Sequence, residues 1–415
     1  MGKELVITVP TQVKNNLNMG NIYEFTLADF YKKVKKMQGC DVEFGVIWNA
    51  NGKPVEESVI EKMGAFSEEE AKKLVSDMIE SSNVTIKQFS IEPDFQIRDD
   101  AIQEDLEKCI DIHYKTLISK GLADVVICSR CGAEFGSDSS VTVCKHCGSK
   151  VYIVNKDTLF TIADRNRLEE KIKKASFYPC GCRKRLNELV ITLPDKYNII
   201  LEKNRKYTLS YNGYRLDPRF VTIFTLPVIK KMRNMEYDVV TVFQGDVVKK
   251  YDYYAFAYLS SNDCPSNIFM HGLIVDGEKK KIRWKSKNSN TTGMVFPGVK
   301  SKELRAFFLK HNITDNIIID ENILKKQVKG QINLFITMKR LLDQRNLDNA
   351  LHGIRGELKE LYDGFILNVN KMNLHDAYKY MYNYVSSCWK LTKYSKLSSE
   401  EQQLVSTYMK LYYGE

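Results

Sequence analysis

The sequence lacks long hydrophobic runs. No run of about 18 apolar residues is present, which is the length that a helix needs to cross a bilayer. Its start, MGKELVITVP, also lacks the apolar core and small-residue cleavage site of a secretory signal. These absences argue against a membrane-spanning or secreted protein, and we expect a cytoplasmic protein with no membrane partner.

Internal repeats and low-complexity linkers are absent as well, which indicates an ordinary globular protein. Its 415 residues are 43% hydrophobic, enough for a large core, and at roughly 100–200 residues per domain they make about two to four domains. Lys+Arg number 62 and Asp+Glu 52, which gives a net charge of +10. This balance favours a polyanionic partner without identifying its class.

The ten cysteines do not have the spacing of a disulfide framework, because four of them gather in one stretch, CSRCGAEFGSDSSVTVCKHCG. Cys128 and Cys131 form one CxxC pair, and Cys144 and Cys147 form a second. Two such pairs supply the tetrahedral four-sulfur shell that zinc prefers, with no position left for a reacting water. We predict a structural zinc ion in a reducing compartment; the alternatives are an iron–sulfur cluster and a site that has lost its metal.

Strand and helix patterns alternate through most of the chain. The apolar run LVITVP is followed by a helical pattern over 22–37 and by a second strand pattern, DVEFGVI. Ser67 stands three residues before a glutamate, which is typical of a helix start, and 238–243 and 267–275 predict two later strands. This alternation predicts an α/β fold with a doubly wound, mostly parallel sheet.

The pattern changes to helix alone from about Asp320, which predicts a C-terminal helical bundle. Two apolar faces at helical spacing support it. The residues that define these faces are Leu324, Val328, Ile332, Phe335 and Leu342 on one helix and Ala377, Met381, Tyr384 and Cys388 on another.

A dense group of lysines follows the predicted strand in HGLIVDGEKKKIRWKSKNSN, residues 271–290. A run of like charge on a loop is most often a solvated surface, and that interpretation stands for this stretch taken alone.

Six segments, in the same order, resemble a class I aminoacyl-tRNA synthetase, most closely the methionyl type. PTQVKNNLNMGN resembles the proline-led HIGH loop, NANGKPV the D-x-HG-TP turn, and FQGDVVKKYDYY the GKD segment. KIRWKSKN resembles the KMSKS loop, ELRAFFLKHN the arginine helix that follows it, and YNYVSSCWKLTK the end of the anticodon-binding helix. The resemblance implies a Rossmann-type sheet that a zinc-knuckle insertion interrupts.

The resemblance also implies boundaries. The expected parts are 1–122, the first half of the catalytic domain; 123–155, the zinc knuckle; 156–275, the second half; 276–319, the lysine-rich loop and a connecting segment; and 320–415, a helical anticodon-binding-like bundle.

The implied activity is ATP-dependent activation of an amino acid or related carboxylate as an adenylate, with magnesium, and transfer to tRNA. The implied ATP-binding residues are Asn18, Gly20, Asn21, Gly245 and Asp246. The implied catalytic residues, facing the departing pyrophosphate, are Lys285, Ser286 and Lys287. The implied substrate-pocket residues are Pro10, Asn49 and Thr225. The implied tRNA contacts are Asn383, Trp389 and Lys390.

The chain departs from the family pattern at the positions that bind ATP and the amino acid in the enzymes that it resembles. Asn18 and Asn21 replace the histidines of the HIGH pattern, Asn49 replaces an acid, and Thr225 stands where an acid holds the ammonium of methionine. Trp284 stands where a small serine is usual. Two hypotheses follow: a synthetase-like enzyme for another carboxylate, or a catalytically silent paralogue that binds tRNA, nucleotide or a protein partner. A plain zinc-ribbon nucleic-acid-binding protein would explain the cysteines but not the two half-sheets.

Overall fold

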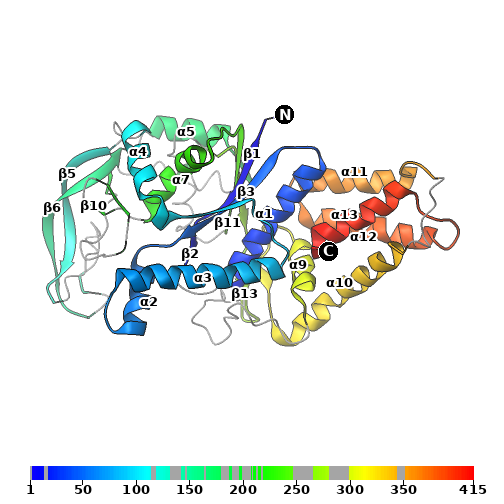
Figure 1. The fold of residues 1–415 in the computed structure, drawn as a ribbon, viewed down its shortest axis with the longest axis horizontal. Coiled ribbons are helices and arrows are strands. Elements are labelled where there is room, and N and C mark those ends of the chain that lie inside the picture. Colours follow the sequence, from blue (N-terminus) through cyan, green and yellow to red (C-terminus); the bar gives the residue numbers. More distant parts are fainter. Residues whose placement is uncertain are drawn as a thin grey trace.

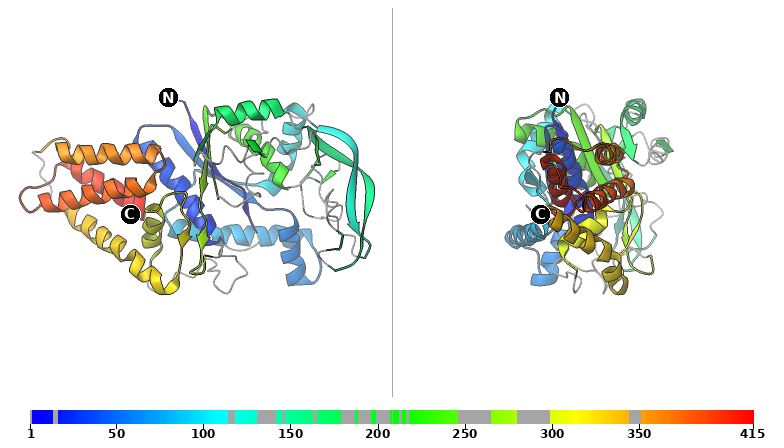
Figure 2. Two further views of the ribbon diagram at one scale, coloured as in Figure 1. Left: turned by 180° about the vertical axis from the view of Figure 1, so that it is seen from behind. Right: turned by 90° about the vertical axis from the view of Figure 1, so that its right-hand side faces the viewer.

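The computed structural model describes residues 2–13, 17–113, 118–130, 142–144, 147–162, 165–178, 187–188, 196–198, 207, 209–211, 214–215, 218–245, 265–279, 299–343 and 351–415. The molecule is elongated, with a long antiparallel ribbon at one end, a parallel sheet in the middle and a helical bundle at the other end (Figure 1). Figure 2 shows the same order from behind.

The central sheet is parallel, as the alternating patterns predict. Its strands run in the order β2-β3-β1-β11-β12-β7, and β4 also pairs with β3. Their bounds are Glu4–Thr8 (β1), Thr11–Gln12 (β2), Val42–Asn49 (β3), Phe95–Arg98 (β4), Ser176–Tyr178 (β7), Val239–Gly245 (β11) and Asn267–His271 (β12). The chain winds from β1 towards β3 on one side and from β11 towards β12 on the other. In sheets of this kind, ligands bind outside the carboxyl ends of the strands at the point of reversal.

Helices cover both faces of the sheet, because alternate residues of each strand enter different cores. On β1, Val6 joins the core beneath α1 (Met19–Met37), whereas Leu5 and Ile7 join a second core. That second core is covered by two packed helices, α4 (Gln103–His113) and α7 (Pro218–Arg233). The three layers confirm the predicted doubly wound α/β fold.

The ribbon pairs β5 (Ile118–Cys128) with β6 (Val151–Ile162) in antiparallel register, from Ile118 opposite Thr161 to Cys128 opposite Val151. A short strand, β8 (Lys196–Asn198), adds to β6. The cysteine stretch therefore lies where the ribbon ends, away from the sheet.

The remaining elements connect these parts. They are α2 (Lys53–Met63), α3 (Glu68–Gln88), the 3-10 turn η1 (Asp99–Ala101), α5 (Arg165–Lys174), β9 (Ser210–Tyr211), β10 (Tyr214–Arg215), β13 (Ile274–Val275), α9 (Ser301–Leu309) and β14 (Ile317–Ile318). Ser67 begins α3 as predicted, since its hydroxyl accepts the Glu70 backbone N–H at 3.4 Å.

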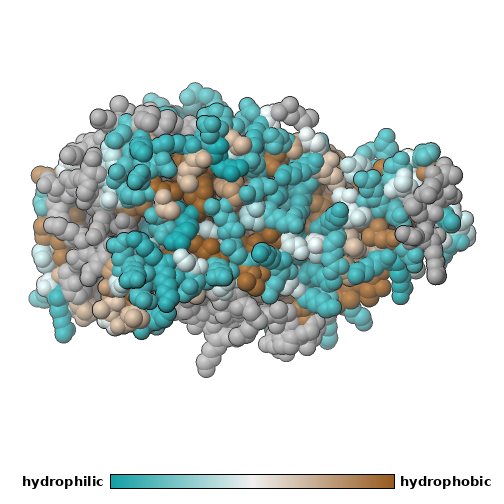
Figure 3. All heavy atoms as spheres, viewed as in Figure 1, coloured by the Kyte–Doolittle hydropathy of each residue, from teal (hydrophilic) through white to brown (hydrophobic). Residues whose placement is uncertain are grey.

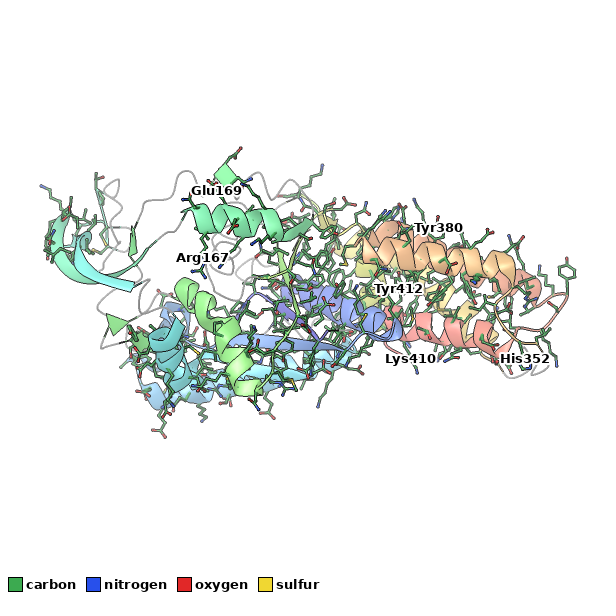
Figure 4. All side chains as sticks on the ribbon, turned by 90° about the horizontal axis from the view of Figure 1, so that it is seen from above. Arg167, Glu169, His352, Tyr380, Lys410 and Tyr412 are labelled. Atoms are coloured by element: carbon green, nitrogen blue, oxygen red, sulfur yellow. The ribbon has the colours of Figure 1, made fainter. Side chains whose placement is uncertain are left out.

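The C-terminal part is helical, as predicted. Its helices are α10 (Glu321–Leu341), α11 (Gly356–Asn370), α12 (Leu374–Leu391) and α13 (Ser399–Tyr413). Ala377, Met381, Tyr384 and Cys388 are all buried on α12. In Figure 4, Tyr412 lies among the bundle helices and Tyr380 at their outer edge.

The predicted strand over 267–275 is divided at Gly272. The Gly272 N–H donates to the Ile313 carbonyl at 2.7 Å, and a Cβ at this position would stand 2.2 Å from the Asp315 carbonyl oxygen. The chain leaves the sheet there, and β13 pairs instead with β14. The sequence pattern could not show this, because the apolar run continues through the break.

No helix in the described ranges is long and apolar enough to cross a membrane. Figure 3 shows one face on which hydrophilic residues predominate and hydrophobic residues form smaller patches.

A fully buried ion pair joins α1 to α9, and its arginine also reaches α13. The guanidinium of Arg305 on α9 donates to Asp29 on α1 at 2.7 Å, to the Phe89 carbonyl at 3.0 Å and to the Leu411 carbonyl at 3.1 Å. Lys33 also pairs with Asp29, at 3.0 Å. Burial alone would raise the pKa of Asp29, but the two cations hold it below its ordinary value.

Replacing one partner of this pair should destabilise the whole chain. We expect Arg305→Met to lower the free energy of unfolding by about 3–5 kcal/mol, because it leaves a buried carboxylate with reduced compensation. Urea unfolding measures the change. The control is Lys72→Met, which removes a solvent-exposed pair with Glu68 and should leave the free energy of unfolding nearly unchanged. Equal losses in both variants would contradict the role given to Arg305.

Candidate active site

The N-terminus of α1 lies directly after the first strands of the sheet and is capped by two asparagines. The Asn21 N–H donates to Asn18 Oδ1 at 3.1 Å, and the Asn18 N–H donates to Asn21 Oδ1 at 3.3 Å. The Ile22 N–H donates to the Asn18 carbonyl. Both asparagine oxygens are thus used in a reciprocal cap, and the amide NH2 groups are the atoms left to meet a ligand.

Two backbone donors in this first turn, the N–H groups of Met19 and Gly20, have no partner among the residues that the structure describes. No acidic residue lies in the first turn of α1. A helix N-terminus of this kind favours an anion, since its free amides and its dipole both present positive charge. A Cβ on Gly20 would stand 3.0 Å from Asn18 Oδ1, so glycine keeps the cap and the amides uncrowded.

The predicted substrate-pocket residues Pro10, Asn49 and Thr225, and the predicted ATP-binding residue Gly245, lie on different elements. Pro10 follows β1, Asn49 ends β3, Gly245 ends β11, and Thr225 is a buried residue of α7. The first three therefore share the carboxyl edge of the sheet, beside the reversal between β1 and β11. Asn49 is 5% exposed, and its carbonyl accepts the Val13 N–H at 2.9 Å.

A buried histidine at this edge was missed by the sequence analysis. His271 ends β12, with Nε2 3.5 Å from Glu24 Oε2 on α1 and Nδ1 2.8 Å from the Gly272 carbonyl. The other oxygen of Glu24 accepts the Val9 N–H at 3.1 Å, and the Tyr23 ring meets the imidazole edge-on at 5.0 Å. The sequence does contain an indication of it, because a histidine ends the otherwise mostly apolar strand sequence NIFMH.

A second missed residue is Asp99, which follows β4. Its carboxylate accepts the Ala50 N–H at 2.7 Å and so holds the turn that follows Asn49. Burial, opposed by that hydrogen bond, raises the pKa of Asp99 to about 7. Its neighbour Asp100 pairs with Arg98 at 2.7 Å.

The cysteine cluster can hold a metal ion. The sulfur atoms of Cys128, Cys144 and Cys147 all lie within 4.8 Å of one another, and the Arg130 N–H donates to the Cys128 sulfur at 3.3 Å. Cys144 begins a tight turn in which its N–H donates to the Ser149 carbonyl at 2.8 Å. Hydrogen bonds from Ser149 to the Cys147 sulfur lower the pKa of that thiol to about 6, which favours the thiolate that binds metal.

The predicted tRNA-binding residues Asn383, Trp389 and Lys390 are all exposed on α12. Trp389 is 37% exposed, with the Arg340 guanidinium 6.0 Å from its ring centroid. It is therefore a surface residue of the bundle and not part of its core.

Several predicted site residues lie outside the described residues. They are Cys131, Asp246, Lys285, Ser286 and Lys287.

Comparison with known proteins supports a synthetase relationship. Residues 3–124 match the family of tRNA synthetases class I (I, L, M and V). The fold is similar to two structures of Mycobacterium tuberculosis methionyl-tRNA synthetase with methionyl-adenylate, which cover 100% of this chain and 92% of their own. Both have a TM-score of 0.71, with 15% and 13% sequence identity. No curated protein sequence matches the chain. Residues 3–124 thus match a class I synthetase family model, and the whole chain has a fold similar to that of a methionyl-tRNA synthetase, as the motifs predict.

The buried Asp99 predicts a dependence of stability on pH. The pKa of Asp99 is about 7 in the folded chain, against an ordinary value of 3.8. The contribution of Asp99 to the free energy of unfolding is therefore most favourable below about pH 4, and it falls as the pH rises to about 7. Asp99→Asn keeps the acceptor for Ala50 and removes the charge. We expect it to be more stable than the parent at pH 8 by up to about 4 kcal/mol, at about 1.4 kcal/mol per unit, with no difference near pH 4.

Urea unfolding across this pH range measures the difference. The control is Asp363→Asn, an exposed change on α11, which should show no such dependence. A constant difference between parent and Asp99→Asn at every pH would contradict the assignment.

Proposed function

We propose that this chain is a synthetase-like enzyme that activates an amino acid or related carboxylate with ATP and magnesium and transfers it to tRNA in the cytoplasm. In this reaction a carboxylate oxygen bonds to the α-phosphorus of ATP, and pyrophosphate leaves with the electrons of the broken P–O bond. The charge that moves onto pyrophosphate needs donors that are already in position.

The proposal rests on the N-terminus of α1, which lies at the reversal point of the sheet. Its first backbone N–H groups have no hydrogen-bond partner among the described residues. The Met19 and Gly20 amides supply donors for a phosphate there, and Asn18 and Asn21 offer their NH2 groups beside them. The capping bonds fix both asparagine side chains, so no ordering is needed when the anion arrives. Gly245 and Asp246 are the proposed contacts on the other side of the nucleotide, and Lys285, Ser286 and Lys287 the proposed contacts of the departing pyrophosphate.

The proposed metal is a structural zinc ion, held by Cys128, Cys144 and Cys147 with Cys131 as the fourth ligand. A four-sulfur shell has no open position, so the ion would stabilise the tip of the ribbon and take no part in the reaction. The proposed tRNA contacts are Asn383, Trp389 and Lys390, where a base can stack on the exposed indole.

A silent paralogue is the second candidate, and the asparagine cap favours it. The oxygens of Asn18 and Asn21 serve α1 itself, and neither residue brings the charge that a histidine can carry. A protein that keeps the fold and binds nucleotide or tRNA without reacting would show this pattern.

Pyrophosphate exchange separates the two candidates. The enzyme should incorporate labelled pyrophosphate into ATP with at least one carboxylic acid, whereas the silent paralogue should not. We expect Lys285→Ala to lower the rate of adenylate formation by about 10²–10³-fold with little change in ATP affinity, as for a donor that acts in the transition state.

The control for this variant is Lys279→Asn, which removes a charge from the same lysine group. Lys279 has φ 62, a conformation that asparagine tolerates. The control should keep both the rate and the affinity. Equal losses of rate and affinity in Lys285→Ala would contradict a transition-state role.

Metal analysis tests the zinc proposal. The purified chain should contain about one zinc ion, and Cys144→Ser should lose it with a fall in melting temperature, since the ion stabilises the ribbon. Cys40→Ser is the matched control, because Cys40 is a half-buried free cysteine outside the cluster. Full zinc content in Cys144→Ser would rule out the proposed ligand set.

A further inference from the structure

Two amide side chains on the strands themselves, one on β3 and one on β11, have buried polar atoms without partners among the described residues. Gln244 is fully buried, and neither its Oε1 nor its Nε2 has a hydrogen-bond partner in the described part of the chain. Asn49 is 5% exposed, and its Oδ1 has none. Buried polar atoms in proteins are nearly always paired, so each exception needs an explanation. We call these two residues the amide pair.

The strand register places the amide pair on one face of the sheet. Phe243 lies beside Thr8, so Gln244 is level with Val9, the residue that follows β1. Gly45 lies beside Ile7, so Asn49 stands two residues beyond that level on the other side of β1. Side chains alternate between the two faces of a sheet. Asn49 and Gln244 each stand two residues after a member of the second core, so both side chains lie on the face of the sheet that α4 and α7 cover. Two strand spacings and the two-residue offset separate their backbones by roughly 12 Å, a span that two side chains and a small acid can bridge.

The described carboxylates at this edge of the sheet already have hydrogen-bond or ion-pair partners. Each of them accepts a hydrogen bond or forms an ion pair, so an ammonium ion would have to share it with that partner. These carboxylates and their partners are Glu24 with Val9, Glu56 with Tyr207, Asp99 with Ala50, and Asp100 with Arg98. Thr225, the residue in the place of an acid, is neutral.

We propose that the amide pair selects a carboxylic acid that carries a neutral hydrogen-bonding group, such as a hydroxyl, in place of an α-ammonium group. This inference rests on the proposed function, since it identifies the class of acid that the site activates. An amide both donates and accepts hydrogen bonds, so it satisfies a hydroxyl from either side. A buried ammonium without an anion is strongly disfavoured, because it loses its hydration and gains no counter-charge.

Matched acids test the proposal. The full chain, with ATP present, is titrated with methionine and its 2-hydroxy analogue, and with leucine and its 2-hydroxy analogue, with binding followed by calorimetry. We expect each hydroxy acid to bind at least about tenfold more tightly than its amino acid. An amino acid that binds as tightly as its hydroxy analogue overturns the proposal, as does the absence of binding by all four acids at millimolar concentration.

Restoring a negative charge should reverse the preference. Gln244→Glu and Asn49→Asp each supply a carboxylate for an ammonium, and we expect either change to favour the amino acid of each pair. The control is Gln403→Glu, which adds the same charge on the exposed surface of α13. A parent-like preference in both site variants overturns the proposal.

Gln244→Met separates a ligand contact from a structural one. Methionine has a similar length and leaves no polar atom unpaired, so the melting temperature should stay the same or rise while the affinity for the hydroxy acid falls about tenfold or more. A lower melting temperature with unchanged affinity would show that the amide serves the fold alone, and overturns the proposal.

Pyrophosphate exchange in the same samples distinguishes the two proposals. Binding that favours hydroxy acids without any exchange would refute the proposed activation and leave the selectivity standing. Exchange that is faster with amino acids would support activation and refute the selectivity.

Discussion

The buried contact between Asp29 and Arg305 joins parts of the chain that are far apart in sequence. Arg305 reaches Asp29 on α1, the carbonyl of Phe89 after α3, and the carbonyl of Leu411 near the end of α13. A charge without a partner in this position would be costly, so the four segments must come together in one arrangement. The carboxylate also accepts the Glu92 N–H at 3.0 Å, which fixes the chain as it enters β4.

The position of α1 links this pair to the site. The same helix presents its first amides to the edge of the sheet at one end and carries Asp29 near its middle. Glu24, nearly two turns after the cap residue Asn18, contacts Val9 and His271, and so ties the helix to the ends of β1 and β12. The donors for an anion are therefore held by contacts made along the helix, and the geometry of the first turn depends on the packing of the C-terminal half of the chain.

The site has an uneven distribution of charge. Positive potential comes from the α1 terminus, whereas the neighbouring strand ends carry neutral amides, and burial raises the pKa of the Asp99 carboxyl in the adjoining turn. Asn49 and Thr225 are neutral where methionyl enzymes use acids, and the structure adds Gln244 to this group. Such an edge suits the triphosphate end of a substrate and gives little to a second positive charge.

Much of the architecture could be predicted from the sequence because strand and helix periodicities were strong over 22–37 and along the C-terminal helices. The spacing of Cys144 and Cys147 likewise indicated a metal cluster. The break at Gly272 could not be predicted, since it depends on the Asp315 backbone from a later segment. The sequence alone also did not indicate His271, Asp99 or Gln244. His271 and Asp99 are identified by hydrogen-bond partners that are distant in the sequence, and Gln244 by the lack of a partner among the described residues.

The break at Gly272 also decides where the lysine-rich segment is anchored. After leaving the sheet, Ile274 and Val275 pair with Ile317 and Ile318, and a Cβ on Gly277 would lie 2.9 Å from Asp320 Oδ2, just before α10. The start of that segment is thus fastened to the root of the helical bundle and not to the strand that precedes it. The position of the first residues of that segment, up to Lys279, therefore depends on the packing at the start of α10 as well as on the sheet.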